Sequence, residues 1–522
     1  MDRPDVPRAV AAVPTPASAG QIAGRARPPA LAQAIQGRTT MQAGLLAVSF
    51  VALVVSWSLN WNILLDTPFI DVTGLEPTLL AGGLLLVVVR GWTVVRSRDR
   101  WWLALVSAYL GWLVAVSITH SPEDIKKSVA YLFFFGVSLA VALVAARLDL
   151  ARAARWVVAF FAVMLLVALL GAILEHLTYP PEGARDPLEG FWSLFRRRAA
   201  FVDPNVGLFK AGPAHYPLGE PGIFRTAGVF AHPVYLAFFG LLATGVMTGL
   251  VIATWRHGRR RTALAWLVGL GVAVFVTYWT YSRAPLAAVL GVVPFAAVVE
   301  LAIRTRRLRR RPRLADFVPG GLAVAAVVLV LGTSISVDNL GLRRLAGTTF
   351  GILASDIGDE ASVEASAART TALRLAAQRL AVEMLADSPG ALLTGTGMAA
   401  YEVAIAEGPN RGGPDPISHP HNAWLTEMLG GGIPAAVLFG LLLGSTCLAA
   451  LRALPRTRDI RRAALLLGLG AWIPIWAVAQ LAGLHPFMAH EAVILGSMLG
   501  FARGFAVDDG TPSEPTALAI PR

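Results

Sequence analysis

Two histidines stand directly before a long apolar run, in the stretch SHPHNAWLTEMLGGGIP at residues 418–434. Imidazole has an ordinary pKa near 6.5, so it is largely neutral at pH 7 and can accept a proton. Ser418 or Asn422 can also cap the first turn of a helix that begins here. His421 is therefore either a candidate general base or an ordinary polar residue at a helix start, and its neighbours decide between the two.

Arginines in three other segments could act together with this histidine. Arg283 lies in a short hairpin between two apolar runs, Arg225 lies just before another run, and Arg374 lies on an amphipathic stretch. A guanidinium group stays charged and binds phosphate oxygens through two parallel hydrogen bonds. A histidine for an attacking hydroxyl and arginines for a diphosphate leaving group suit glycosyl transfer from a lipid diphosphate. Contact with lipid headgroups or solvent is the alternative role for each arginine taken alone.

The composition is that of a polytopic membrane protein. Of 522 residues, 55% are hydrophobic and 15% are charged, and the mean hydropathy is +0.61; one soluble core could not bury this much apolar surface. The net charge of +12 does not indicate nucleic acid, because the arginines form short clusters between apolar runs. The single cysteine, Cys447, allows neither a disulfide framework nor a thiolate metal site.

Twelve apolar segments are long enough to cross a membrane as helices. They are 43–64, 77–95, 101–118, 129–146, 156–178, 229–253, 263–281, 285–303, 317–336, 423–450, 463–483 and 490–506. With the N-terminus inside, the cytoplasmic connections hold 23 Lys and Arg residues and the short external ones hold 3. This bias predicts that both termini are cytoplasmic. Residues 1–42 and 507–522 are predicted to be disordered tails around a membrane domain at 43–506.

Two connections are long, 179–228 and 337–422, and this topology places both outside. The second contains apolar residues at helical spacing, which predicts an external amphipathic helix at about 362–387. The first contains PLEGFWSLFRRRAAF, which predicts a shorter amphipathic segment with Arg196, Arg197 and Arg198 at lipid phosphates.

Four motifs in order resemble the O-antigen ligase and O-antigen polymerase superfamily. His421 and Asn422 precede Gly432 with nine residues between, as in that family's His-Asn-x9-Gly signature. The second motif is a Ser-Arg hairpin, which corresponds to Arg283. The third is an arginine fifteen residues before a proline and followed by Gly-x-Gly; counting back from Pro389 gives Arg374 rather than Arg369. The fourth is an Arg-x-x-Gly segment, which corresponds to Arg225. The chain departs from the family pattern at Gln378, at His232-Pro233-Val234 and at Ala435, and Glu491 is the nearest counterpart of the family's late acidic residue.

The resemblance implies an all-α fold of the GT-C type and a metal-independent, inverting glycosyltransferase without cofactors. The donor would be a glycan on undecaprenyl diphosphate at the periplasmic face of a bacterial inner membrane, and membrane lipids would surround the protein. His421 would be the general base, and Arg283, Arg374 and Arg225 would bind the diphosphate. His419, Asn422 and Glu427 are expected to support them, Glu427 either structurally or by holding a sugar hydroxyl.

Three alternative functions are considered for this sequence. A polymerase uses the same donor as a ligase and differs in its acceptor, which is a growing glycan instead of the lipid A-core saccharide. A twelve-helix transporter would have ionisable residues in mid-span and an internal repeat, and the sequence has neither. A metal-dependent enzyme would need paired acids in the first external connection, where Asp66, Asp71 and Glu76 stand five residues apart.

Overall fold

The computed structural model describes most of the chain between residues 29 and 507. The described residues are 29–58, 64–66, 71–73, 75–91, 99–179, 188, 191–192, 216–217, 224–230, 232–308, 311–353, 362–387, 389–407, 420–482 and 489–507. His419 and Arg196, Arg197 and Arg198 lie outside them.

The described chain is almost entirely helical, which confirms an all-α membrane protein. Ten helical segments are long and apolar enough to cross a membrane. They are α1 (Pro29–Ser58), α3 (Arg100–Ser117), the continuous run of α4 (Pro122–Tyr131), η4 (Leu132–Val137) and α5 (Ser138–Leu148), α6 (Leu150–Thr178), α8 (Pro233–Arg256), α9 (Arg260–Trp279), α10 (Arg283–Leu308), α11 (Leu314–Val337), α16 (Ala423–Ala453) and α17 (Ile460–Ala479).

Two further predicted spans correspond to shorter helices. α2 (Leu75–Leu86) continues into η1 (Val87–Gly91), and α18 covers Ala489–Phe505. The count of twelve spans therefore remains a prediction. Two short antiparallel hairpins complete the described elements: β1 (Leu64–Asp66) with β2 (Asp71–Thr73), and β3 (Tyr216–Pro217) with β4 (Phe224–Arg225).

The first helix begins earlier than the sequence analysis predicts. α1 starts at Pro29, within the segment expected to be a disordered tail. Tertiary contacts hold the last residue of this extension, because the buried Gln42 side chain donates to the carbonyl of Ala145 at 3.2 Å and to that of Asp149 at 2.8 Å. This part of α1 is therefore fastened to the end of α5.

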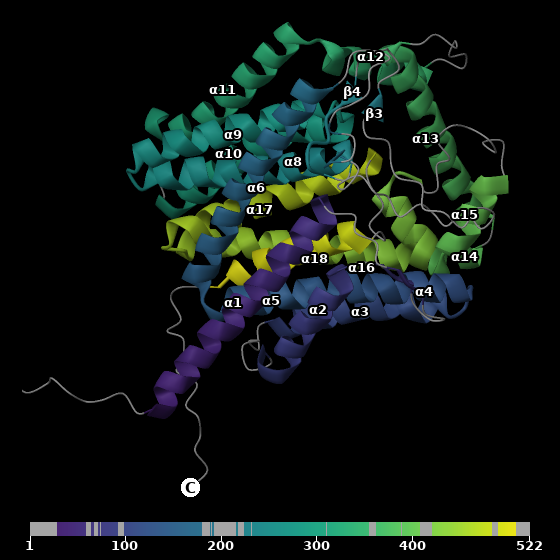
Figure 1. Cartoon of the computed structure of the whole chain (residues 1–522), viewed down its shortest axis with the longest axis horizontal. Coiled ribbons are helices and arrows are strands. Elements are labelled where there is room, and N and C mark those ends of the chain that lie inside the picture. Colours follow the sequence, from purple (N-terminus) through teal and green to yellow (C-terminus); the bar gives the residue numbers. More distant parts are fainter. Residues whose placement is uncertain are drawn as a thin grey trace, which may run out of the picture.

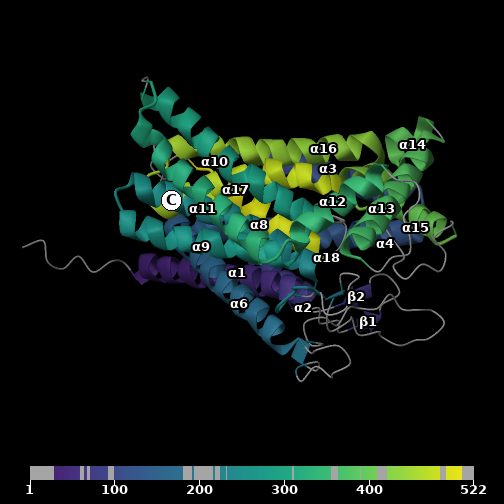
Figure 2. The same cartoon turned by 90° about the horizontal axis from the view of Figure 1, so that it is seen from above.

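Helix α8 forms the centre of the bundle, with α9, α10 and α17 around it (Figures 1 and 2). Its apolar window is buried on all sides. Gly245 and Gly249 face Gly468 and Ala464 of α17, and a Cβ atom on Gly249 would collide with the Ala464 carbonyl. Small residues let two membrane helices approach closely, so this pair forms a tightly packed interior seam.

The second long connection folds into helices. α13 (Val363–Ala386) agrees with the helix predicted at 362–387, and the Ser362 side chain caps it by accepting from the amide of Ala365 at 3.1 Å. The sequence analysis did not predict its neighbours α12 (Leu340–Leu353), α14 (Pro389–Thr394) and α15 (Met398–Glu407). Both views show α12 to α15 gathered at one end of the bundle (Figures 1 and 2).

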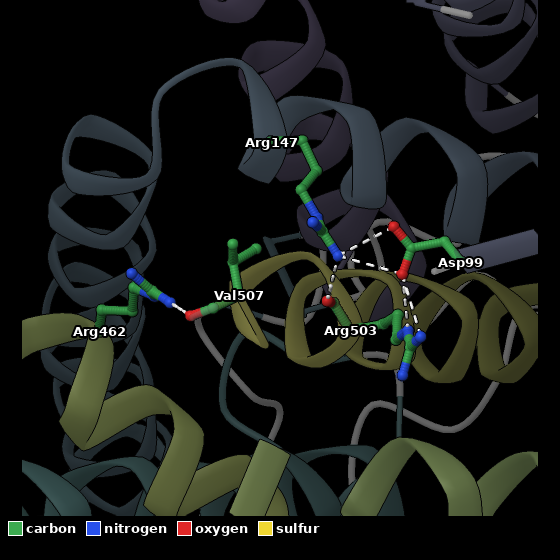
Figure 3. A network of polar contacts seen from close by, with 5 residues as sticks. All are labelled: Asp99, Arg147, Arg462, Arg503 and Val507. Atoms are coloured by element: carbon green, nitrogen blue, oxygen red, sulfur yellow. Dashed lines mark hydrogen bonds and ion pairs between the residues drawn. The ribbon is translucent and has the colours of Figure 1, made fainter. Parts of the chain in front are cut away.

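A buried ion network fastens the opposite end (Figure 3). Asp99 accepts from Arg147 at 3.1 Å and from Arg503 at 3.0 Å, and Arg147 also donates to the Arg503 carbonyl. Beside it, Arg462 of α17 donates to the carbonyls of Phe505 and Val507. These contacts join the start of α3 and the end of α5 to the end of α18.

Candidate active site

The hairpin between α9 and α10 places Arg283 as the first residue of α10. Its Nη1 donates to the Ala367 carbonyl at 3.1 Å, to Thr371 Oγ1 at 2.6 Å and to Thr348 Oγ1. The Arg283 side chain is therefore fixed by hydrogen bonds to acceptors on α12 and α13. All three bonds use Nη1, so the Nε and Nη2 edge of the guanidinium has no acceptor among the described residues. That edge has the fork geometry that binds a phosphate.

Arg344 of α12 lies beside Arg283 and is 6% exposed. Its Nη1 donates to the carbonyl of Tyr281 at 2.9 Å, whereas its Nε has no partner among the described atoms. Burial lowers the pKa of Arg344 well below its usual value, and the positive charges of Arg225 and Arg374 lower that pKa further. A bound anion would oppose both effects.

Arg374 lies in the middle of α13, and its charge also acts on Arg283. Burial lowers the pKa of its guanidinium, and its Nε has no hydrogen-bond partner in the described structure. Arg369, the alternative loop arginine, is exposed to solvent. The charge of the mostly buried Arg374 thus acts on Arg283, whereas Arg369 is exposed.

Arg225 reaches the same hairpin from β4. Its Nε donates to the Thr280 carbonyl at 3.1 Å and its Nη2 to Ser282 Oγ at 2.7 Å. The segment that follows is fastened by the buried Glu175 of α6, whose carboxylate accepts from the amides of Ala227 at 2.9 Å and Gly228 at 2.6 Å. The sequence analysis assigned no role to Glu175.

Gly228 is required at its position for two reasons. Its φ of +55° lies in the left-handed region, and a Cβ atom there would meet the backbone of Gly171 and Ala172 at about 3.2 and 3.1 Å. In the Arg-x-x-Gly motif, the arginine is therefore followed by a glycine that lets the chain turn in close contact with α6.

The four arginines form a positively charged cluster, which we call the arginine cluster: Arg225, Arg283, Arg344 and Arg374. Arg283, Arg344 and Arg374 form no ion pair with an acid of the described chain. Two carboxylates nearby have other partners: Asp338 accepts from the hydroxyl of Tyr281 and from the amide of Leu340, and Glu364 pairs with Arg343. Several partly buried cations without counter-ions repel one another, so the cluster is suited to a multiply charged anion.

His421 directly precedes the cap of α16. The buried Asn422 side chain accepts from the amides of Trp424 at 3.0 Å and Leu425 at 3.2 Å, which satisfies the first turn. Asn422 therefore performs the capping role that the sequence allowed. His421 is half-buried and has a φ of +51°, a left-handed conformation that costs a non-glycine residue roughly 1–2 kcal/mol.

Backbone strain marks both parts of the candidate site. Within the described chain, Tyr281 and His421 are the two non-glycine residues with positive φ. One stands two residues before Arg283, and the other is the candidate base. Unfavourable backbone conformations persist where surrounding contacts impose them, and they concentrate at functional sites.

Helix α13 links the arginine cluster to the start of α16. Its first half carries Thr371 and Arg374, whereas Ala377, Ala381 and Leu385 in its second half pack with Leu429 of α16. Gln378 donates to the carbonyl of Leu481 at 3.3 Å, in the turn η6 (Gln480–Ala482) that follows α17. The arginine cluster and His421 therefore lie at the same end of the bundle.

The glycine of the His-Asn-x9-Gly motif lies at a break in α16, and the Gly-x-Gly segment packs against the same part of this helix. Gly431 and Gly432 leave the helical conformation, and the indole of Trp112 donates to the Gly431 carbonyl at 2.7 Å. The carbonyl of Leu429 accepts from the amides of Thr396 at 3.0 Å and Gly397 at 2.9 Å. The Gly-x-Gly segment thus docks onto the helix that carries His421.

Two carboxylates lie deeper in the bundle. Glu427 is fully buried and accepts from the hydroxyl of Tyr109 on α3 at 2.7 Å, and Tyr109 contacts Tyr131 at 3.1 Å. Glu491, at the start of α18, is also buried and acts electrostatically on Tyr131. This geometry favours a structural role for Glu427 over contact with a sugar.

The sequence analysis missed Arg344, Thr348 and Thr371. Arg344 belongs to the stretch LGLRRLAGTTF, whose alternation of apolar and polar residues suits an amphipathic helix. Thr371 lies one helical turn before Arg374 on the predicted helix, so the two side chains lie on the same face of that helix. Only the contacts across three helices identify these residues as partners of Arg283.

Residues 268–440 match the family model described as O-Antigen ligase. The matched segment includes Arg283, Arg344, Arg374 and His421, and it begins after Arg225. No match was found among curated proteins. This segment of the chain is therefore similar to the O-antigen ligase family.

Proposed function

We propose that this chain is a membrane glycosyltransferase, a proposal supported by the match of residues 268–440 to the O-Antigen ligase family model. Its donor is a glycan on undecaprenyl diphosphate, and its acceptor is a saccharide hydroxyl at the periplasmic face. The observation that carries the proposal is the arginine cluster, in which the guanidinium groups of Arg283, Arg344 and Arg374 pair with no acid of the described residues. A diphosphate supplies the missing negative charge.

The reaction proceeds by a single inverting displacement. His421 removes the proton from the acceptor hydroxyl as general base. The hydroxyl oxygen forms a bond to the anomeric carbon from the side opposite the diphosphate, while the bond from that carbon to the diphosphate oxygen breaks. The bonding electrons remain on the departing diphosphate, and the proton remains on His421 until it is released to water.

The arginines stabilise the charge that develops on the leaving group. Arg283 offers its Nε and Nη2 edge, and Arg344 and Arg374 each have an Nε atom without a described partner. Fixed cations in a partly desolvated site stabilise a developing charge without reorganising, and such stabilisation is usually the largest catalytic contribution. Arg225 keeps the Thr280 and Ser282 turn in place and adds to the positive potential.

No metal takes part in the proposed reaction, because the arginines perform the charge neutralisation that a divalent cation would perform. Transfer by the purified protein in liposomes should proceed in EDTA at the rate seen without it. Loss of transfer in EDTA, with recovery on adding a divalent cation, would contradict this part of the proposal.

Acceptor choice decides between ligase and polymerase. The test is transfer from an undecaprenyl-diphosphate oligosaccharide to lipid A-core saccharide or to a second lipid-linked oligosaccharide, in separate reactions with the same preparation. We expect the lipid A-core saccharide to be glycosylated. Products that lengthen only on the lipid-linked acceptor would identify a polymerase, and absence of transfer to either acceptor would reject the proposed function.

A further inference from the structure

A large cavity opens at the end of the bundle opposite the arginine cluster. It lies between the last turns of α10 and the corner where α16 passes into η5 (Leu454–Arg456), and its volume is about 1310 Å³. Arg306, on its wall, is 23 residues beyond Arg283 along α10, or about 35 Å at the rise of an α-helix. The cavity is therefore separate from the candidate active site.

The lining of this cavity has an apolar part and a basic part. The apolar part consists of Val299, Ala302, Ile303, Leu448 and Leu451. The basic part consists of Arg306, Arg307, Arg452, Arg456 and Arg458. No acidic residue lines the cavity within the described chain. Such a surface matches a ligand with a negatively charged head and an apolar tail.

Two of these arginines are available to a ligand. Arg306 and Arg452 are exposed, and their side chains have no acceptor among the described residues. The acids nearby are already engaged, because Glu300 pairs with Arg256 and Asp316 pairs with Arg304 at 3.3 Å. The positive charges of Arg306 and Arg452 are thus not compensated by an acid of the described residues.

We propose that this cavity is a binding site for an anionic phospholipid, with the phosphate at Arg306 and Arg452 and an acyl chain along the apolar part. Arginine clusters at the ends of membrane helices attract anionic headgroups, and a guanidinium binds phosphate through two hydrogen bonds. An inorganic anion would use the arginines alone and leave the apolar part in contact with water. The inference does not depend on the reaction at the other end of the bundle.

The proposal is tested by titrating the purified full-length protein in detergent with phosphatidylglycerol or with phosphatidylcholine of the same acyl chains, followed by native mass spectrometry. Phosphatidylglycerol should bind more tightly. In the doubly substituted Arg306→Gln/Arg452→Gln protein its affinity should fall about 25-fold, because each arginine near an anionic headgroup contributes on the order of a fivefold change. Equal affinity for the two lipids, or no change in the variant, would overturn the proposal.

A matched pair of substitutions controls for charge. Arg155 and Arg261 are exposed at the same end of the bundle, on α6 and α9, and do not line the cavity. The Arg155→Gln/Arg261→Gln protein loses the same charge and should bind phosphatidylglycerol as the unsubstituted protein does. An equal loss in this control would show diffuse attraction instead of a site.

A third variant separates a lipid from a free anion. Ala302→Trp fills the apolar part and leaves every arginine in place, so it should weaken binding of phosphatidylglycerol at least tenfold. Glycerol phosphate, added as competitor at the lipid concentration, should not displace the lipid. Unchanged lipid binding by Ala302→Trp, or displacement by glycerol phosphate, would identify an anion site and refute the lipid proposal.

Discussion

At the residue scale, the distinguishing feature is a group of three partly buried arginines, Arg283, Arg344 and Arg374, that form no ion pair with a described acid. The lowered pKa of Arg344 shows the electrostatic cost of this arrangement. A diphosphate would reverse that cost and raise the pKa towards its ordinary value. Arg283 differs from its neighbours because three acceptors hold one edge of its side chain and leave the other edge open.

Replacement of His421 tests the proposed base. His421→Ala should lower the turnover number by roughly two to four orders of magnitude, because no other group would take the proton. Affinity for the lipid-diphosphate donor should stay within a factor of about three, since the arginine cluster remains. Turnover is measured by glycan transfer and affinity by donor binding. A fully active variant would exclude His421 as the base.

The arginine on α13 is tested by a pair of substitutions. Arg374→Lys should lower turnover by at least tenfold, because a compact ammonium group does not reproduce the two-bond geometry of a guanidinium. Arg369→Lys, five residues earlier and exposed, should transfer glycan at nearly the original rate. An inactive Arg369→Lys beside an active Arg374→Lys would show that the motif was aligned to the wrong arginine.

At the scale of elements, α13 and the break in α16 determine how the site is assembled. α13 supplies acceptors to Arg283 with one half and packs on α16 with the other. The break at Gly431 and Gly432 receives the Gly-x-Gly segment and the end of α14. His421 is thereby fixed relative to α13 by contacts that begin two turns away from it.

Gly432 is the most sensitive position in this assembly. Gly432→Ala places a methyl group against the carbonyl of Leu393 at φ +68° and ψ −171°, a backbone region almost restricted to glycine that alone costs about 1–3 kcal/mol. Both the melting temperature and the turnover number should fall. In Gly444→Ala, on the same helix, the added methyl group has no neighbouring atom within contact distance. This substitution should lower neither the melting temperature nor the turnover number. A Gly432→Ala protein as active and stable as Gly444→Ala would show that the break is dispensable.

At the scale of the whole molecule, the two ends of the helix bundle carry different charged groups. One end carries α12 to α15 (Figure 1), together with the arginine cluster. The other end carries the Asp99 network (Figure 3) and the arginine-lined cavity. The buried Asp99 is shared by two arginines, so its loss would remove a buried counter-ion from both cations.

Asp99→Asn should therefore destabilise the protein by about 3–5 kcal/mol, the usual cost of breaking a buried ion pair. The measurement is the midpoint of thermal unfolding in detergent. Asp149→Asn is the control, because Asp149 is a partly exposed helix cap, and asparagine caps equally well. Equal midpoints for the two variants would contradict a stabilising role for the network.

The predicted orientation is tested by thiol labelling in intact cells. After Cys447→Ala, a membrane-impermeant maleimide should label Glu123→Cys, in the exposed first turn of α4, once the outer membrane is permeabilised. Arg259→Cys, in the turn between α8 and α9, should react only after lysis. The reverse pattern would place the arginine cluster on the cytoplasmic side and reject the periplasmic site.

The sequence by itself determined the membrane class, most of the helices and the residues worth examining. Apolar length, arginine bias and motif spacing are local properties, so α13 and the spans from α3 to α11 could be predicted closely. The motif order also selected Arg225, Arg283, Arg374 and His421 before any contact was known.

Only the tertiary structure decided which of these residues meet. Thr348, Thr371 and Arg344 join Arg283 because α12 and α13 fold back over the hairpin, and no local pattern encodes that contact between distant segments. The structure also assigned Asn422 to a helix cap and Glu427 to a buried bond with Tyr109. The physical reason is that burial and charge interaction depend on neighbours from other helices, whereas periodicity depends on the chain alone.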